Sequence, residues 1–275
     1  MCNAALRDAF FSSLRSGPQV MGVLNVTPDS FSDGGRHADP ETAAVVARDM
    51  IAAGAAIVDV GGESTRPGST PVNEEEELSR VLPALERLSE ARLPLSIDTT
   101  KAAVATKAAA LGAILVNDVW GLQKDPRMAE TIAQSQVGLV VMHNREKADP
   151  SLDILDDLKR FFDRSLALAA GAGIPQSRIL IDPGIGFGKT LEQNLTCLWR
   201  LDALKPYRLP ILVGVSRKSF IGRILDAPVD RRLIGTLAAG MVALMRGASV
   251  LRVHDVSEHV EIVKMFGAMK GAGIG

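Results

Sequence analysis

The sequence has few cysteines, few aromatic residues and almost no excess charge of either sign. Its 275 residues include two cysteines, Cys2 and Cys197, and 31 basic residues stand against 32 acidic ones for a net charge of -1. Two cysteines outside any CxxC pair are too few for a disulfide framework, which fits a reducing, cytoplasmic location. The balanced charge, with no basic block, argues against a nucleic acid partner.

Long hydrophobic runs are also missing. The longest nearly uncharged stretch, residues 233–245, is shorter than the ~20 residues that a membrane helix needs. We therefore expect a buried helix there and no membrane partner. Arg7, Asp8 and Arg15 interrupt the apolar residues at the N-terminus, which argues against a secretory signal. With 47% hydrophobic residues and no linker, the chain is expected to form a single domain over residues 1–275.

Eight short runs rich in Val, Ile and Leu recur along the chain, with stretches of helical period between them. The runs are residues 20–26, 57–60, 95–97, 114–116, 139–142, 179–181, 211–215 and 250–253. The helical stretches include residues 40–53, 73–91, 101–111, 152–170 and 191–204, several of which open with a capping Asp, Asn or Thr. Runs that are apolar on both faces indicate parallel strands. The alternation predicts an α/β fold, a (β/α)₈ TIM barrel with a short N-terminal segment; a doubly wound open sheet would show the same alternation with fewer strands.

Polar residues follow every predicted strand. They lie at residues 25–29, 59–63, 98–100, 117–118, 143–144, 182–184, 216–218 and 252–255. A single Asp or Asn after a strand is more often a cap or a turn former. Because the carboxyl ends of barrel strands share one rim, eight such ends predict a polar pocket.

The side chains at this rim suggest the chemistry of a ligand. Three of them could read the N–H groups of a heterocycle, and three cationic ones could bind an anion. The first set is Asp98, Asn117 and Asp182, and the second is Lys218, Arg252 and His254. A flat heterocycle that carries phosphate would satisfy both sets.

Residues 182–189, Asp-Pro-Gly-Ile-Gly-Phe-Gly-Lys, superficially resemble a phosphate-binding loop but lack the Walker spacing. The glycines are better explained by a close approach of the backbone to a flat ligand beneath Phe187. Two further glycine-rich segments, residues 27–36 and 63–72, are either surface connections or loops that close over a substrate. The four histidines are scattered and no HExxH occurs, so a zinc site is not expected.

Several long motifs, in order along the chain, resemble the signatures of the dihydropteroate synthase family. They are residues 21–35 (MGVLNVTPDSFSDGG), 59–68 (DVGGESTRPG), 182–189 (DPGIGFGK) and 216–222 (SRKSFIG), joined by residues 96–99, 117–118 and 252–255. The resemblance implies a (β/α)₈ barrel, a Mg²⁺ cofactor and a homodimer. It also implies a transferase of folate biosynthesis that joins p-aminobenzoate to 6-hydroxymethyl-7,8-dihydropterin pyrophosphate, giving 7,8-dihydropteroate and pyrophosphate.

The resemblance also assigns roles to individual residues. It places the pterin against Asp98, Asn117, Met142, Asp182, Phe187, Gly214 and Lys218. It places the pyrophosphate near Asn25, Arg66, Arg252 and His254, with Asn25 as the Mg²⁺ contact. It places p-aminobenzoate near Phe31, Thr65, Pro67, Lys218 and Ser219. The catalytic roles fall to Asp98, Lys218 and Arg252, and a carboxylate at Asp98 would stabilise a pterin ring that becomes positive.

One departure and two alternatives accompany the resemblance. Residues 143–146, His-Asn-Arg-Glu, replace the Met- and Gly-containing sequence common in the family, which leaves the shape of that loop open. A pterin-dependent methyltransferase would use a similar barrel, but residues 27–35 and 216–222 argue against it. A catalytically silent pterin-binding paralogue would be expected to lose charged groups at the phosphate end, yet Arg66, Lys218 and Arg252 are present.

Overall fold

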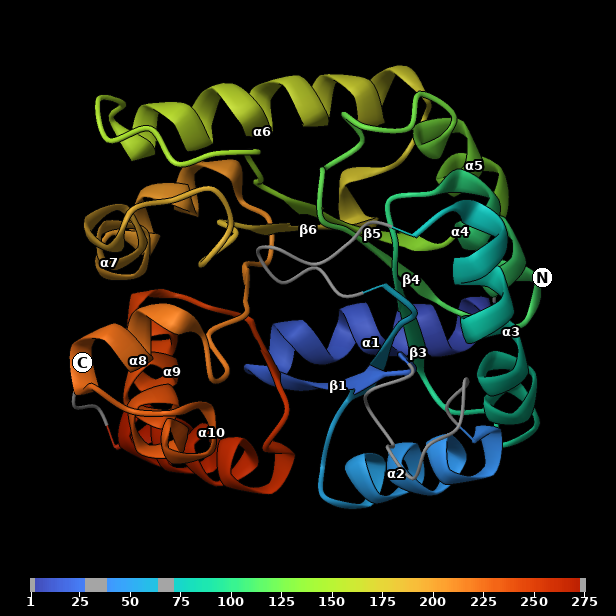
Figure 1. The fold of residues 1–275 in the computed structure, drawn as a ribbon, viewed down its shortest axis with the longest axis horizontal. Helices are drawn as coiled ribbons and strands as arrows, with labels where there is room; N and C mark the ends of the chain where they lie inside the picture. Colours follow the sequence, from blue (N-terminus) through green and yellow to red (C-terminus); the bar gives the residue numbers. More distant parts are fainter. Residues whose placement is uncertain (1–2, 28–38, 64–71, 273–275) are drawn as a thin grey trace.

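The structure is a computed structural model, and it describes residues 3–27, 39–63 and 72–272. The strands are β1 (Gln19–Asn25), β2 (Ile57–Gly61), β3 (Leu95–Asp98), β4 (Leu115–Asp118), β5 (Gly138–Met142), β6 (Ile179–Asp182), β7 (Leu212–Val213) and β8 (Val250–Val253). The helices are α1 (Ala4–Ser16), α2 (Pro40–Ala52), α3 (Glu74–Glu90), α4 (Ala102–Ala110), α5 (Met128–Ser135), α6 (Ile154–Gly171), α7 (Leu191–Trp199), α8 (Ser219–Leu225), α9 (Leu233–Arg246) and α10 (Val256–Gly271). From α2 onward the helices follow one another around the strands (Figure 1).

The strands form a nearly closed parallel barrel. Their order in the sheet is β6-β5-β4-β3-β2-β1-β8-β7. A parallel bridge between Ile181 and Ile211 brings the two edges together, and the Ile181 N–H donates to the Pro210 carbonyl at 3.0 Å. The predicted (β/α)₈ TIM barrel is therefore confirmed, and the observed strand ends differ from the predicted ones by at most two residues.

Helix α1, the N-terminal segment, closes one end of the barrel. Phe10 and Phe11 of this helix pack in a core cluster with residues near the starts of the strands: Met21, Ile57, Leu115, Val140, Leu180, Leu212 and Val250. A Cβ built on Gly138 would lie 2.7 Å from the Phe11 ring, so the start of β5 needs a glycine to admit this helix. Because α1 fills the amino-terminal end, the carboxyl ends of the strands face the opposite rim.

Side-chain caps begin several of the predicted helices. The side chains of Asn73 and Asp153 accept hydrogen bonds from backbone N–H groups in the first turns of α3 and α6. Thr190 and Gln193 form a reciprocal capping box at the start of α7. These contacts satisfy N–H groups that have no partner inside a helix, and they fix where each strand-to-helix loop ends.

Two helix predictions need correction. The helix predicted at residues 191–204 ends at Trp199, because the backbone of Arg200 (φ -106°, ψ 27°) leaves the α-helical conformation. The chain continues as a 3₁₀ segment, Leu201–Tyr207. The stretch at residues 233–245 does form a helix, but it is not fully buried. Ile234 is 81% and Met245 70% exposed. Among the described residues, no helix has the length and apolar character to cross a membrane.

Candidate active site

The strand register brings predicted site residues into rows at the carboxyl rim. Along one row, Asn25 pairs with Gly61, Gly61 with Asp98, and Asp98 with Asn117. Neighbouring parallel strands lie ~4.8 Å apart, so these side chains converge on one end of the barrel. A Cβ built on Gly61 would lie 3.6 Å from both Asn25 Oδ1 and the Cβ of Asp98. In the same way, Met142 pairs with Asp182.

Arg252 of β8 links two acidic residues, Asp59 of β2 and Asp98 of β3. Its Nη2 donates to Asp98 Oδ2 at 2.7 Å, and its Nε donates to Asp59 Oδ2 at 2.6 Å. Asp59 Oδ2 also accepts a hydrogen bond from Asn117 Nδ2 at 3.1 Å. Asp59 is completely buried and was not among the predicted site residues. One feature of the sequence could have identified it: Asp59 is a carboxylate inside an apolar strand run, and a buried carboxylate requires a partner.

Several buried oxygens at the rim have no hydrogen-bond partner within the described part of the chain. They are Asp98 Oδ1, Asn117 Oδ1, Asp59 Oδ1 and Ser96 Oγ. Buried polar atoms almost always have partners. A ligand whose N–H groups point at the Asp98 and Asn117 oxygens would supply them, as the sequence predicted for a heterocycle.

Burial shifts the ionisation of the charged groups at this rim. It raises the pKa of Asp98 to about 7, although Arg252 opposes the shift. It raises the pKa of Asp182 as well, against the nearby Lys218. For Lys218 burial works in the other sense and lowers the pKa to about 7, despite the carboxylate of Asp182. Ligand contacts at these groups should therefore be coupled to proton uptake and release near neutral pH.

Phe187, Gly214 and Lys218 meet on the side of the rim formed by the loops after β6 and β7. The Lys218 ammonium lies 4.7 Å from the centre of the Phe187 ring and donates a hydrogen bond to the Ile185 carbonyl. A Cβ on Gly214 would approach Lys218 Nζ to 3.6 Å. The structure thus brings together the aromatic wall and the lysine that the resemblance assigned to the pterin.

The predicted anion-binding residues lie on the neighbouring strand ends. Asn25 ends β1, Arg252 lies in β8, and His254 directly follows β8. His254 is exposed, and its ring Nδ1 lies 3.0 Å from Ser216 Oγ, which also accepts from the His254 backbone N–H at 3.2 Å. Ser216 therefore ties the loop after β7 to the end of β8. Arg66 lies outside the described residues.

Most of the predicted p-aminobenzoate contacts cannot be placed. Phe31, Thr65 and Pro67 lie outside the described residues, as do most of the two glycine-rich segments. Lys218 and Ser219 are described: Ser219 is exposed and is the first residue of α8. Of the two, Lys218 contacts the Phe187 ring.

The side chains that could act as metal ligands show whether a Mg²⁺ ion would fit at this rim. Among the described residues, no group of three His, Cys, Asp or Glu side chains is arranged to hold a metal ion. Asn25 offers a single amide oxygen beside Gly61 and Asp98. Mg²⁺ prefers oxygen ligands and commonly takes only one or two from the protein, with substrate phosphates and water completing the shell. The residues therefore fit an ion that is shared with a bound diphosphate, and do not form a metal site of their own.

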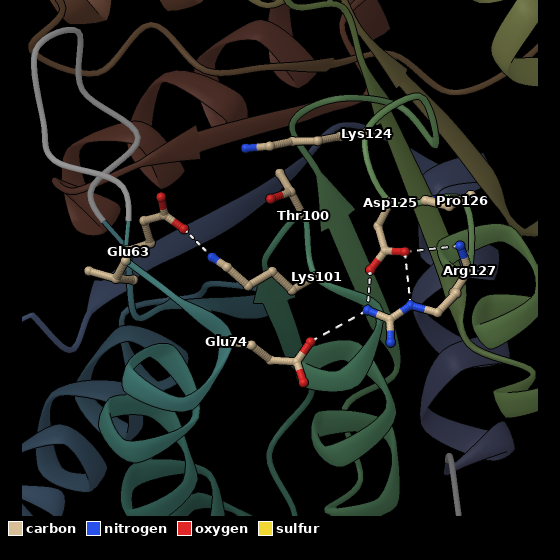
Figure 2. A pocket seen from close by; sticks show the side chains of 9 residues that line it. Glu63, Glu74, Thr100, Lys101, Lys124, Asp125, Pro126 and Arg127 are labelled. Carbon is tan, nitrogen blue, oxygen red and sulfur yellow. Dashed lines mark hydrogen bonds and ion pairs between the residues drawn. The ribbon is translucent and has the colours of Figure 1, made fainter.

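A separate pocket of ≈ 460 Å³ opens beside the ends of β2 and β3 (Figure 2). It is lined by Glu63, Val72, Glu74, Thr100, Lys101, Lys124, Asp125, Pro126 and Arg127. Its charges largely neutralise one another: Lys101 pairs with Glu63 and Glu77, and Arg127 with Asp125 and Glu74. Of the predicted site residues that the structure describes, none lines it.

Comparison with known proteins places this site in a family. The family model described as pterin binding enzyme matches residues 21–254. The dihydropteroate synthase of Bacillus subtilis is 45% identical over 255 residues, which cover 92% of this chain and 89% of that relative. The chain therefore belongs to the pterin-binding enzymes, and within them to the dihydropteroate synthase family.

Solved structures agree with this placement. The structure of the Clostridium difficile dihydropteroate synthase, obtained in the presence of pteroic acid, superposes with a TM-score of 0.89 at 45% identity and covers 92% of this chain and 97% of that one. The Xanthomonas albilineans dihydropteroate synthase with 4-aminobenzoic acid gives a TM-score of 0.88 at 42% identity and covers 92% of this chain and 93% of that one.

Proposed function

We propose that this chain condenses 6-hydroxymethyl-7,8-dihydropterin pyrophosphate with p-aminobenzoate to give 7,8-dihydropteroate and pyrophosphate. The observation that carries the proposal is the position of Arg252, which joins Asp98 to Asp59 at one rim. In this position the Arg252 guanidinium can bind a leaving anion, and it lies directly beside carboxylates that can accept hydrogen bonds from the N–H groups of a ring. The similarity to a structure with pteroic acid and to one with 4-aminobenzoic acid supports the same substrates.

The ring-binding half of the reaction uses acceptors that burial holds away from water. Asp98, Asn117 and Asp182 accept the N–H groups of the pterin, and Met142, Phe187 and Gly214 line the slot. As pyrophosphate departs with the electrons of the methylene C–O bond, positive charge spreads over the ring. The carboxylate of Asp98 stabilises that charge in a site where water is scarce. The amine of p-aminobenzoate then forms the C–N bond and loses a proton to solvent.

The leaving-group half uses the cations. Arg252 and His254, with Arg66, bind the diphosphate and stabilise its growing charge. Asn25 would hold a Mg²⁺ ion shared with the diphosphate, and that ion would neutralise part of the charge. Lys218 lies between the Phe187 ring and the Ile185 carbonyl, so it contacts both the pterin slot and, with Ser219, the approach of p-aminobenzoate.

The two alternative functions receive no support. The relative and the solved structures described above are dihydropteroate synthases, and none is a methyltransferase. For a silent paralogue, loss of the charged groups would be expected, yet Lys218 and Arg252 lie together at the rim with the acids they would work with.

One assay tests the function directly. The chain is mixed with Mg²⁺, the dihydropterin pyrophosphate and labelled p-aminobenzoate, and dihydropteroate and pyrophosphate are measured. Equal amounts of both products are expected, and Arg252→Gln should abolish most of the turnover. Lys159→Met, a change at an exposed lysine of α6, is the matched control. A folded chain that binds the pterin but forms neither product would support the silent paralogue instead.

We also propose a homodimer in which α9 meets a second copy of the chain. Ile234, Ala238, Met241 and Met245 follow one another at helical spacing along α9, and all but the partly exposed Met241 are exposed. Ile224 and Leu225 of the neighbouring α8 are 52% and 51% exposed. Helices α8 and α9 lie together on the outer side of the barrel (Figure 1). An apolar stripe of this kind suits a twofold contact, in which the same patch serves both subunits.

A further inference from the structure

The loop after β6, residues 184–188, lies directly on the main chain that follows β5. Gly184 and Gly188 both have positive φ, +66° and +53°. A Cβ on Gly184 would lie 1.8 Å from the His143 carbonyl oxygen, and one on Gly188 would lie 2.3 Å from that of Arg145. Residues 143–146 directly follow β5. They form the surface on which this loop rests.

Lys189, at the end of the same loop, turns back into the protein. Its ammonium contacts the Gly184 carbonyl at 2.9 Å, the Phe187 carbonyl at 3.1 Å and His143 Nδ1 at 2.8 Å. An ammonium has three N–H donors, and these three acceptors use them all. With its donors directed to these three acceptors, the Lys189 ammonium is not free to bind a phosphate in this arrangement.

His143 connects the lysine to a carboxylate on α6. Its Nδ1 accepts from Lys189, so the ring proton lies on Nε2, which is 3.1 Å from Asp157 Oδ2. Burial lowers the pKa of His143 to about 3, and the nearby ammonium of Lys189 acts in the same direction. The imidazole is therefore neutral at physiological pH. It links the cation of Lys189 to the anion of Asp157 without adding a charge of its own.

We propose that Lys189 is a positioning residue for the pterin slot, acting through the carbonyls of Gly184 and Phe187 and held in place by His143 and Asp157. The loop it fixes carries Phe187, the wall of the slot, and the Ile185 carbonyl that accepts from Lys218. Lys189 itself contacts neither substrate. The inference rests on the proposed function, because it concerns the site in which that function places the pterin.

Lys189→Met tests the proposal, because methionine fills a similar volume and removes all three donors. The Kd of a non-reactive pterin should rise about tenfold, and the KM of the pterin pyrophosphate should rise with it. The KM of p-aminobenzoate at saturating pterin should stay within about twofold of wild type. Hydrogen exchange should increase at the amides of residues 184–188 and remain unchanged in β3 and β4. Lys159→Met again serves as the control for removal of a lysine.

Asp157→Asn provides a second test, outside the loop, if the lysine variant does not fold. The asparagine carbonyl can still accept from His143, but the negative charge opposite Lys189 is lost. A two- to fivefold rise in the Kd of the pterin is expected, with faster exchange in the same loop. The proposal is overturned if a folded Lys189→Met variant binds the pterin as tightly as wild type does. If only Asp157→Asn folds, wild-type pterin affinity in that variant overturns it. Failure of wild type itself to bind the pterin would instead overturn the proposed function.

Discussion

Asp59 is the residue on which the geometry of the candidate site most depends, although no ligand contact was assigned to it. One of its oxygens accepts from both Arg252 and Asn117. These hydrogen bonds hold the cation for the leaving group and a ring-binding amide in fixed positions. A buried carboxylate with a charged partner is costly to disturb, because removing its charge leaves the partner uncompensated.

Asp59→Asn should therefore lower both stability and activity. The amide oxygen can still accept from Arg252 and Asn117, but the negative charge that compensates the buried Arg252 is lost, and the amide N–H groups replace an oxygen that has no partner within the described part of the chain. We expect the free energy of unfolding to fall by ~1–3 kcal/mol, and kcat/KM to fall at least ~10-fold. Urea unfolding and steady-state kinetics measure the two effects. Asp163→Asn, at an exposed acid of α6, is the control. A loss of stability with unchanged kcat/KM would limit Asp59 to a structural role.

Asp98 and Lys218 predict proton exchange on pterin binding, with opposite signs. The pKa of each is about 7 in the free protein. Ring N–H groups that donate to Asp98 favour its charged form and lower its pKa, which releases a proton at pH 6–7. A ring acceptor at Lys218 favours the ammonium and raises its pKa, which takes up a proton at pH 7–8.

Calorimetry in buffers of different ionisation enthalpy separates these two effects. Relative to wild type, Asp98→Asn should shift the proton count on pterin binding toward uptake, and Lys218→Met should shift it toward release. The same proton count in wild type and both variants would mean that neither group contacts the ligand. Asp163→Asn supplies the control for loss of a carboxylate outside the site.

At the scale of elements, the strand-to-helix loops decide how well the site is held. Helix α7 starts with a capping box in which Gln193 N–H donates to Thr190 Oγ1 at 3.1 Å and Thr190 N–H donates to Gln193 Oε1 at 3.0 Å. Gln193 Nε2 also donates to the Asp149 carbonyl at 2.7 Å. The cap therefore joins α7 to the loop after β5, on which residues 184–188 rest.

Thr190→Ala should remove the cap and lower the free energy of unfolding by ~0.5–2 kcal/mol. Thr190→Ser keeps the hydroxyl and should stay near wild type. Thermal unfolding of the two variants, followed by circular dichroism, makes the comparison. If serine destabilises the protein as much as alanine does, the threonine methyl group rather than the cap carries the stability.

The sequence predicted elements better than it predicted contacts between them. Strand positions follow from local apolar runs, so the barrel and the rim residues Asp98, Asn117, Asp182 and Arg252 could be placed on strand ends. The partners of Asp59 and Lys189 come from strands and loops far apart in the sequence. A local pattern therefore could not show that Asp59 holds Arg252, or that Lys189 bonds to its own loop. Likewise, the lack of charged residues at 233–245 is compatible with a buried helix and with a helix that exposes an apolar face, so the sequence could not distinguish the two.

At the scale of the whole molecule, the exposed face of α9 remains to be explained. The other face of this helix packs inward through Thr236, Ala239, Gly240, Ala243 and Leu244. The outer face presents the stripe from Ile234 to Met245. An apolar stripe beside other exposed apolar residues costs free energy in water, and the cost disappears when a second copy covers it. A twofold axis near α9 would place each stripe against its equivalent and leave the carboxyl rim of both barrels open.

Ile234→Glu should therefore convert the proposed dimer to a monomer, because it would place like charges opposite each other across a twofold contact. Sedimentation velocity over a range of concentrations measures the mass directly, and Val45→Glu, at an exposed apolar residue of α2 on another part of the barrel, is the matched control. The monomeric variant should retain its pterin affinity, since none of the rim residues that bind the ring belongs to α9. A wild-type chain that stays monomeric at high concentration would contradict the dimer. An Ile234→Glu variant that stays dimeric would place the contact on another face.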